Sequence, residues 1–312
     1  MKPNKRTKLS LASFQVMFST DDKCRAYLEH TIWKNTPTCR HCQSTNVGKV
    51  VGKSARAGLH QCHQPKCGKQ FTVTVGTIFQ DTHLPLTKWF MAIYLLTETS
   101  KGVSANWLKD AIGTTYKTAW YLGHRIRRMM DAGDAMLTGI VEIDETYVGG
   151  KPRKGSDKPV KRGRGTNKAP VFVAVQRGGE VRATTMDNLK FQTMKPHLQK
   201  WISGDATLMT DEFSPYNKLG SIWKYHFTVQ HGAGEYANGD VHINTAESFN
   251  STLKRAYIGV YHYMSPKHLL RYVSESVYRW NKRSLTTLDR LADVLGCGVS
   301  RPLPYRVLVG SR

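Results

Sequence analysis

The 312-residue sequence has few acidic side chains, few cysteines and no long apolar run. It holds 23 Asp and Glu against 46 Lys and Arg, and the resulting formal charge of +23 exceeds what solubility requires. We therefore expect a polyanionic partner. Because the basic residues are spread along the chain among aromatic residues, nucleic acid is favoured over an anionic membrane, which would bind one amphipathic stripe.

The apolar segments are too short for membrane insertion or secretion. The longest, residues 89–96, is well below the ~20 residues that span a bilayer, and the basic N-terminus lacks a secretory apolar core. We therefore expect a cytoplasmic protein that does not contact a membrane. A hydrophobic content of 40% allows a real core, and the length predicts two or three domains.

The six cysteines suit a metal site in a reducing compartment better than a disulfide framework, because four of them form two pairs. Two pairs, each on a tight turn and separated by two strands, can hold one structural Zn²⁺ tetrahedrally, as in a zinc ribbon. The second pair has four intervening residues, including Pro65, so its turn must be enlarged. The predicted ligands are Cys39, Cys42, Cys62 and Cys67, with His63 less favoured. Cys24 and Cys297 are expected to be small buried hydrophobic residues.

A helical pattern extends over residues 84–130. Two short helices, residues 104–112 and 116–130, are joined by a turn that carries Gly113, which is typical of a helix-turn-helix. An ordinary helical bundle with a solvated basic face would give the same pattern. The neighbouring zinc ribbon and the high charge favour DNA binding, and the basic residues expected to serve it are Arg125, Arg127 and Arg128.

The following segment predicts an α/β fold. Alternating apolar and polar residues in the stretch VEIDETYVGG, residues 141–150, indicate a strand that ends in a turn. A hairpin, a helix and two further strands follow, at residues 170–186, 191–203, 206–211 and 225–229. Three strands in a meander, then a helix, then a strand returning beside the first form the layout of a ribonuclease-H-like domain, a mixed sheet flanked by helices.

Three acidic residues are the candidate catalytic centre. The ends of neighbouring strands lie about 5 Å apart, so we expect the carboxylates of Asp144 and Asp211 to share a cation and a helix crossing the sheet to add Glu247. Oxygen ligands suit Mg²⁺ or Mn²⁺, and two such ions can support phosphoryl transfer. The attacking group would be water or a DNA 3′-hydroxyl.

Lys254 strengthens this assignment. It follows Glu247 by seven residues, which returns it to within about 20° of the same helical face, where it can bind DNA phosphate. Each carboxylate alone is weak evidence, because Glu142, Glu145, Glu212 and Asp240 are equally acidic. The order and spacing of Asp144, Asp211 and Glu247, together with Lys254, distinguish these three residues from the other acids.

Other polar segments near these residues are candidate DNA contacts. Residues 151–168 are rich in Gly, Pro and basic residues, and we expect them to lie along phosphates, with disorder as the alternative. His231 and His242 flank the loop before the Glu247 helix, and a surface role is favoured over contact with the scissile phosphate. Packing is favoured over base stacking for Tyr257, Tyr261, Tyr263 and Trp280.

Several motifs together resemble bacterial insertion-sequence transposases of the DDE type, in the subgroup with an N-terminal zinc ribbon. The resemblance covers about residues 20–285. The matching residues are Cys39-x-x-Cys42, Cys62, Cys67-Gly-Lys-Gln-Phe-Thr, Thr118-Ala-Trp120, Val141-Glu-Ile-Asp-Glu-Thr-Tyr-Val-Gly-Gly150, Asp211, Gly234-Glu-Tyr236 and Asn244-Thr-Ala-Glu-Ser-Phe with Leu253-Lys-Arg255.

The resemblance implies that Asp144 and Asp211 bind metal, that Glu247 is the third acidic ligand and that Lys254 contacts DNA. In some relatives an asparagine replaces the third acid, which makes the asparagines of the same helix alternatives. These are Asn244 and Asn250. The resemblance further implies binding of terminal inverted repeats and target DNA, strand cleavage, and strand transfer by a homo-oligomer in a synaptic complex.

We therefore expect five parts. They are an N-terminal helical segment at 1–35, the zinc ribbon at 36–80, the helix-turn-helix region at 84–130, the ribonuclease-H-like catalytic domain at 138–285 and a C-terminal tail at 286–312 without a readable motif. Two other functions fit part of the pattern. A DNA-binding regulator would bind DNA without chemistry, and a nuclease that uses only water would cleave DNA or RNA without joining it.

Overall fold

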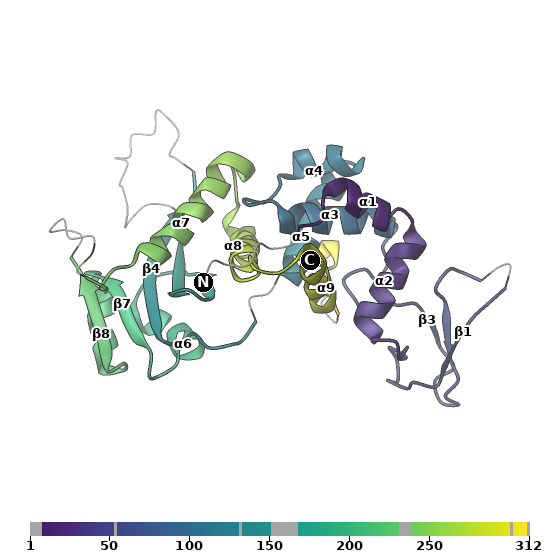
Figure 1. The fold of residues 1–312 in the computed structure, drawn as a ribbon, viewed down its shortest axis with the longest axis horizontal. Helices are drawn as coiled ribbons and strands as arrows, with labels where there is room; N and C mark the ends of the chain where they lie inside the picture. The colour runs from purple at the N-terminus through teal and green to yellow at the C-terminus, as the bar shows by residue number, and fades with distance from the viewer. Residues whose placement is uncertain are drawn as a thin grey trace. The chain divides into compact units, whose positions relative to one another are not determined.

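The computed structural model describes residues 8–52, 55–130, 133–150, 168–230, 237, 239–299 and 302–310. The chain forms two compact units (Figure 1), one of Met1–Met130 with Ser284–Arg312 and the other of Asp131–Arg283. The C-terminal residues, for which the sequence offered no motif, therefore belong to the first unit. Most of the basic segment at 151–168 lies outside the described residues.

The first unit begins with two capped helices and a small sheet. Helix α1 (Leu11–Met17) is capped by Ser10, and α2 (Asp21–Trp33) is capped by Thr20, so each begins at a side chain that accepts a hydrogen bond from its first turn. Strands β1 (Val47–Lys49), β2 (His60–Cys62) and β3 (Gln70–Phe71) pair antiparallel in that order. Trp33 packs edge-on against His60, which joins the end of α2 to the sheet.

The rest of this unit is helical. Helix α3 (Leu86–Glu98) is followed by α4 (Ala105–Ile112) and α5 (Tyr116–Met129), and two further helices, α9 (Thr287–Cys297) and α10 (Tyr305–Val309), come from the C-terminal residues. Gly113 ends α4 in the left-handed conformation, at φ 58°, and Thr115 caps α5 two residues later. The two short helices and their glycine turn are thus where the sequence predicts them. Helix α9 packs against α2, α3 and α5.

The basic face predicted for α5 is largely wrong. Arg125 and Arg127 are buried, and Arg125 donates to the carbonyl oxygens of Ile78 and Gln80 and stacks on the Trp89 ring. The Arg125 guanidinium thus satisfies core carbonyls, and the burial of both side chains keeps them from a DNA phosphate. Of the three arginines only Arg128 is exposed. At the other end of α5, Tyr116 and Lys117 are exposed instead.

The second unit has a five-stranded mixed sheet in the order β6-β5-β4-β7-β8. Its strands are β4 (Ile140–Val148), β5 (Ala169–Gln176), β6 (Val181–Thr185), β7 (Thr207–Asp211) and β8 (Tyr225–Val229). Strands β4, β5 and β6 form the antiparallel meander, and β7 and β8 run parallel to β4. This order confirms the predicted ribonuclease-H-like layout.

Helices cover both faces of this sheet. Helix α6 (Phe191–Trp201) and the 3₁₀ segment η1 (Ser214–Ser221) pack on one face over a core that includes Val141 and Ile143. Helices α7 (Asn244–Ala256) and α8 (Pro266–Asn281) cover the other face, with the short π-helix η3 (Tyr257–Tyr261) between them. Figure 1 shows α7 crossing the sheet at β4. Each apolar side chain buried in these cores contributes about 1.5–3 kcal/mol.

The packing predicted for the four aromatic residues near α7 holds for three, because Tyr257, Tyr261 and Trp280 are partly buried against the core on this face of the sheet. Tyr261 packs against the core and donates to both carboxylate oxygens of Glu275, and Trp280 packs edge-on against Phe249. Tyr263 is 67% exposed, so for this residue the prediction of core packing is wrong. Cys24 is buried as expected, and burial raises the pKa of its thiol to about 12.

Candidate active site

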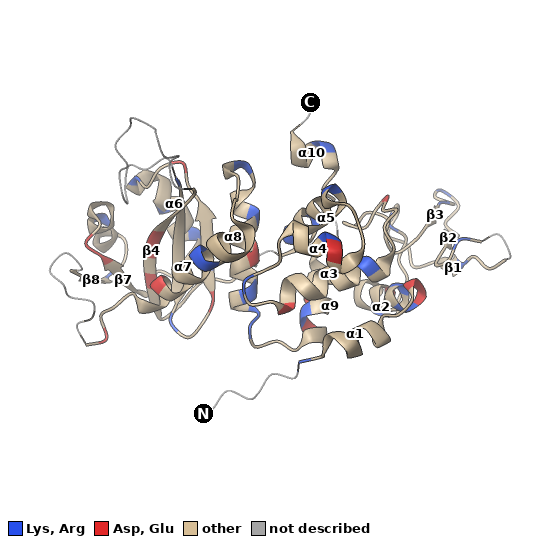
Figure 2. Cartoon of the chain, turned by 90° about the horizontal axis from the view of Figure 1, so that it is seen from above, with Lys and Arg blue, Asp and Glu red and all other residues tan. Residues whose placement is uncertain are grey.

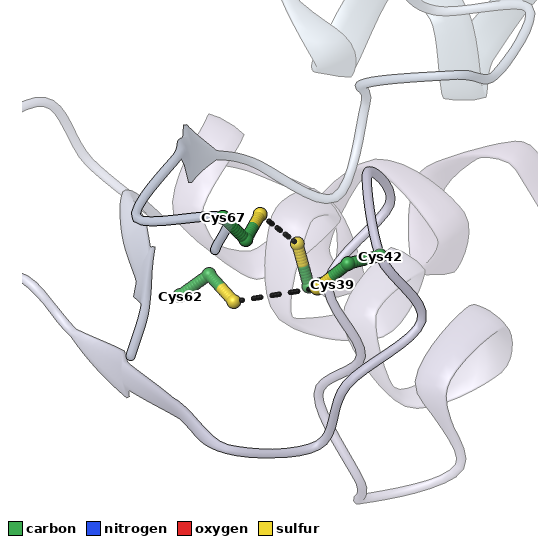
Figure 3. Close-up of side chains that lie close together, drawn as sticks. All are labelled: Cys39, Cys42, Cys62 and Cys67. Atoms are coloured by element: carbon green, nitrogen blue, oxygen red, sulfur yellow. Dashed lines mark hydrogen bonds between the residues drawn. The ribbon is translucent and has the colours of Figure 1, made fainter. Parts of the chain in front are cut away.

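The four predicted cysteines converge in the first unit. Their ligand atoms all lie within 4.8 Å of one another, with Sγ–Sγ distances of 3.8 Å for Cys39–Cys67 and 3.5 Å for Cys42–Cys62. A tetrahedral Zn²⁺ with bonds of about 2.3 Å would separate its sulfur ligands by roughly 3.8 Å. Figure 3 shows the thiols turned toward one another. The cluster therefore fits a structural zinc ion with no open ligand position.

The widened second cysteine pair closes through its own turn. The amides of Cys67 and Gly68 both donate to the carbonyl of Gln64, and Gly68 takes φ 55°, a left-handed conformation that glycine adopts without strain. This turn returns Cys67 toward Cys39 despite the two extra residues. His63 is exposed and is not a member of the metal-binding group.

The sheet register brings Asp144 and Asp211 together in the second unit. Strands β4 and β7 pair in parallel at Val141–Leu208 and Glu142–Met209, and two further residues in the same register set Asp144 beside Asp211. Asp211 is the last residue of β7, and its Oδ1 accepts from the Phe213 amide at 3.0 Å. Figure 2 shows acidic residues on β4 and on α7.

Asp144 has an unusual environment for a carboxyl group. Burial, the nearby Glu145 carboxylate and the Asp211 carboxylate raise its pKa from 3.8 to about 7. Two hydrogen bonds favour the ionised form, from the Glu145 amide to Oδ1 and from Asn250 Nδ2 to Oδ2, each 2.8 Å long. These hydrogen bonds offset only part of the repulsion between the neighbouring carboxylates. A bound cation would reduce the rest.

On α7 the structure brings Asn250 to Asp144. Asn250 is buried, and its Oδ1 has no hydrogen-bond partner within the described residues. A buried carbonyl oxygen without a partner costs free energy, and an amide oxygen is a suitable ligand for Mg²⁺ or Mn²⁺. Glu247, the predicted third ligand, lies one turn earlier with an exposed side chain, and Asn244 is also exposed at the helix start. The donors near Asp144 thus fit a hard divalent ion.

Lys254 is exposed in the last turn of α7, four residues after Asn250. Residues four apart lie about one helical turn apart on neighbouring parts of one face. His231 lies outside the described residues, whereas His242 contacts Arg177 and Glu142. The loop motif that includes Glu235 also lies outside the described residues.

Sequence reasoning missed two acidic residues with defined contacts. Glu142 is fully buried and binds the N-terminus of α7, and Glu145 accepts a 2.8 Å hydrogen bond from the buried Tyr216 hydroxyl. Composition and spacing alone do not distinguish either residue from the other acids of the chain. Strand alternation could have separated them, because Glu142 shares a face with Asp144 and Glu145 points to the opposite face.

The chain is similar in sequence to two transposase domain families and to a protein from a transposable element. Residues 136–281 match the ISXO2-like transposase domain, and residues 19–70 match the transposase zinc-ribbon domain. A protein of Halobacterium salinarum, described as an uncharacterized protein in transposable element ISH50, is 32% identical over 272 residues. That alignment covers 82% of this chain and 89% of the halobacterial protein.

Solved structures give weaker matches. A chain of the simian T-cell lymphotropic virus intasome in complex with PP2A regulatory subunit B56 gamma matches with 14% identity and a TM-score of 0.27, covering 61% of this chain and 65% of that chain. A pre-cleavage Mos1 transpososome matches with 10% identity and a TM-score of 0.26, covering 68% of this chain and 78% of that chain. Because these TM-scores are low, the two matches do not contribute to the fold assignment, which depends on the strand order.

The strand order and the family match indicate the same class of domain. The second unit is a transposase domain of ribonuclease-H-like fold. A zinc-ribbon match precedes it, and the relative from ISH50 covers most of the chain. The protein belongs to the IS1595 family of insertion-sequence transposases with an N-terminal zinc ribbon. None of the described helices is long and apolar enough to span a bilayer.

The cysteine cluster predicts how zinc content depends on individual thiols. We expect the purified protein to hold about one zinc ion per chain and the Cys67→Ser variant to lose most of it, because three thiolates bind zinc less tightly than four. Elemental mass spectrometry measures the metal. Cys297→Ser is the control, because this half-buried thiol lies in α9 outside the cluster. Equal zinc content in the two variants would contradict the assignment.

The Asp144 environment predicts a stability that falls with pH in magnesium-free, zinc-loaded protein. The folded state binds the Asp144 proton more tightly than the unfolded state, so this stabilisation is complete below pH 3.8 and is lost as the pH rises through about 7. The change is at most about 4 kcal/mol. Calorimetric unfolding from pH 5 to 8 should show a steeper decline for wild type than for Asp144→Ala.

The matched control for this measurement is Asp187→Ala, which removes an exposed aspartate of the same unit. It should keep the wild-type pH dependence. A decline of equal slope in wild type and Asp144→Ala would rule out Asp144 as its source.

Proposed function

We propose that this protein is a cytoplasmic DNA transposase that binds the terminal inverted repeats of an insertion sequence and catalyses metal-dependent strand cleavage and strand transfer. The observation that carries the proposal is the meeting of Asp144, Asp211 and Asn250 where β4, β7 and α7 approach one another. Family membership supports transposition as the biological context. The net charge of +23 supports DNA as the partner.

We propose Mg²⁺ or Mn²⁺ as the catalytic cofactor, held by Asp144, Asp211 and the amide oxygen of Asn250. The unpartnered buried Oδ1 favours Asn250 over Glu247, whose side chain is exposed. Bound divalent ions would activate the attacking oxygen and stabilise the leaving oxygen of the phosphodiester. The Asn250 amide would keep Asp144 ionised and oriented by donating to its Oδ2.

Lys254 would bind a DNA phosphate next to the reacting one. This role is supported by its exposure and by its place one turn beyond Asn250 on the same helix. The attacking group would be water in strand cleavage and a DNA 3′-hydroxyl in strand transfer. Joining both ends of one element to a target brings two DNA ends and the target together, so we propose that a homo-oligomer assembles them in a synaptic complex.

The test uses end-labelled DNA that carries the inverted repeats flanking the gene, together with a target plasmid. We expect wild type with Mg²⁺ to nick the ends and to join a pre-cleaved 3′ end to the plasmid, and Asp144→Ala to do neither. Binding without nicking would favour the DNA-binding regulator. Nicking without a joined product would favour a nuclease that uses only water.

The same assay decides the third ligand. We expect Asn250→Ala to lower the cleavage rate by at least roughly 100-fold, because changes even to residues behind metal ligands cost 10–100-fold. Glu247→Gln keeps side-chain length and removes only the charge, and it should stay within about 3-fold of wild type. The reverse ranking of the two variants would return the role to Glu247.

Substituting Lys254 should weaken DNA binding without changing its sequence preference. We expect Lys254→Ala to lower affinity about 3-fold to 10-fold and to reduce the slope of log affinity against log salt by about one, because one phosphate contact is lost. Fluorescence anisotropy at several salt concentrations measures both. Lys195→Ala, on the exposed side of α6 across the sheet, is the matched control and should bind like wild type.

A further inference from the structure

Glu142 is a fully buried acid that the proposed metal site does not use. It lies on β4 two residues before Asp144, on the same face of the strand. Its carboxylate accepts four hydrogen bonds, and three of them come from one end of α7. The three donors on α7 are the Thr245 amide at 2.7 Å, the Ala246 amide at 3.0 Å and the Thr245 hydroxyl at 3.0 Å.

The fourth hydrogen bond comes from Arg177 in the turn between β5 and β6, whose Nε lies 2.8 Å from Glu142 Oε1. Arg177 also donates to the carbonyl oxygens of Asp240 and His242, in the segment that leads into α7. The His242 ring lies 3.4 Å from the same carboxylate. The buried charge is therefore neutralised by groups that also hold the chain entering α7.

Helix α7 lacks a cap of its own. Its N-cap residue is Ile243, which has no side-chain oxygen, so its first amides would be unsatisfied in a buried position. Glu142, 103 residues away in sequence from Thr245, supplies the missing acceptor and places a negative charge at the positive end of the helix. The cap of α7 is thus part of the strand that carries Asp144.

The spacing of the two contacts is matched on the strand and on the helix. From Glu142 to Asp144, two residues of β4 advance about 6.6 Å, and from Ala246 to Asn250, four residues of α7 advance about 6 Å. The first contact is the hydrogen bond from the Ala246 amide to Glu142, and the second is the hydrogen bond from Asn250 to Asp144. Two contacts with matched spacing fix both the position of α7 along β4 and the rotation of α7 about its own axis.

We infer that Glu142 is a positioning residue for the active site, because it sets the rotation of α7 at which Asn250 meets Asp144. The inference rests on the proposed function for its catalytic consequence, but the Glu142–α7 contacts are independent of it. A carboxylate with only a stabilising role would affect unfolding and would leave the metal requirement of the folded enzyme unchanged.

The test measures the Mg²⁺ concentration that gives half-maximal cleavage and the calorimetric affinity for Mn²⁺, with Asp144→Ala as the blank. For Glu142→Gln we expect the Mg²⁺ requirement to rise and the Mn²⁺ affinity to fall about 10-fold, because the amide offers one acceptor where donors surround the carboxylate. Hydrogen exchange of the first turn of α7 should also become faster.

Matched variants separate positioning from general damage. Glu180→Gln removes the partner of the buried Arg182 in the same sheet and should keep the wild-type metal requirement. Thr245→Val deletes the hydroxyl donor to Glu142 and should raise the requirement about 3-fold, whereas Thr245→Ser retains that donor and should restore it. The Thr245→Val and Thr245→Ser variants test the positioning role even where Glu142→Gln does not fold.

A wild-type metal requirement and Mn²⁺ affinity in folded Glu142→Gln, or in Thr245→Val, would overturn the inference. Equal changes in Glu180→Gln would overturn it as well. If wild type makes no cleaved or joined product, the proposed function fails. Mn²⁺ affinity and exchange in α7 still measure the positioning role in that case, because neither needs turnover.

Discussion

The second unit depends on how one helix is held over one strand. Helix α7 and strand β4 are more than 90 residues apart in sequence, yet two polar contacts on one face of β4 join them, through Glu142 and through Asp144. The apolar residues of α7, including Phe249 and Leu253, pack on β5 and α8 and supply most of the burial. Apolar packing alone tolerates small rotations of a helix, whereas hydrogen bonds between buried groups do not.

Strand β4 serves three purposes through simple alternation. Val141 and Ile143 point into the core beneath α6, and Glu142 and Asp144 point to α7. Glu145 returns to the α6 face, where it accepts from the buried Tyr216. Every acidic group of this run therefore has a specific donor, which is the condition for placing carboxylates inside a sheet.

Much of this fold follows from local sequence signals. The zinc ligands were predictable because tight cysteine pairs impose their own geometry, and the extra residues of the second pair are absorbed by a turn that ends at Gly68. The order of strands and helices was predictable from periodicity. The glycine turn between α4 and α5 was also predictable, because Gly113 adopts the left-handed conformation that ends a helix.

What the sequence could not decide has one physical cause, since it concerns which face of a helix is covered by a distant segment. Arg125 and Arg127 have the spacing of a basic surface, but carbonyl groups from the segment before α3 accept from Arg125, and α9 packs on α5. Glu247 and Asn250 are three residues apart and share much of one face. Only the rotation of α7, set by contacts from β4, distinguishes them.

The choice of an amide near Asp144 also has an electrostatic reason. Burial, together with the Glu145 and Asp211 carboxylates, already raises the Asp144 pKa to about 7, and a further carboxylate in contact would raise it more. An asparagine supplies an oxygen without charge, and its NH₂ group stabilises the ionised aspartate. The site would then hold a divalent ion with two negative charges instead of three, which leaves more of the ion's charge to act on DNA phosphate. The weaker ion binding that follows makes the exact placement of the amide, and hence the cap that orients α7, more important.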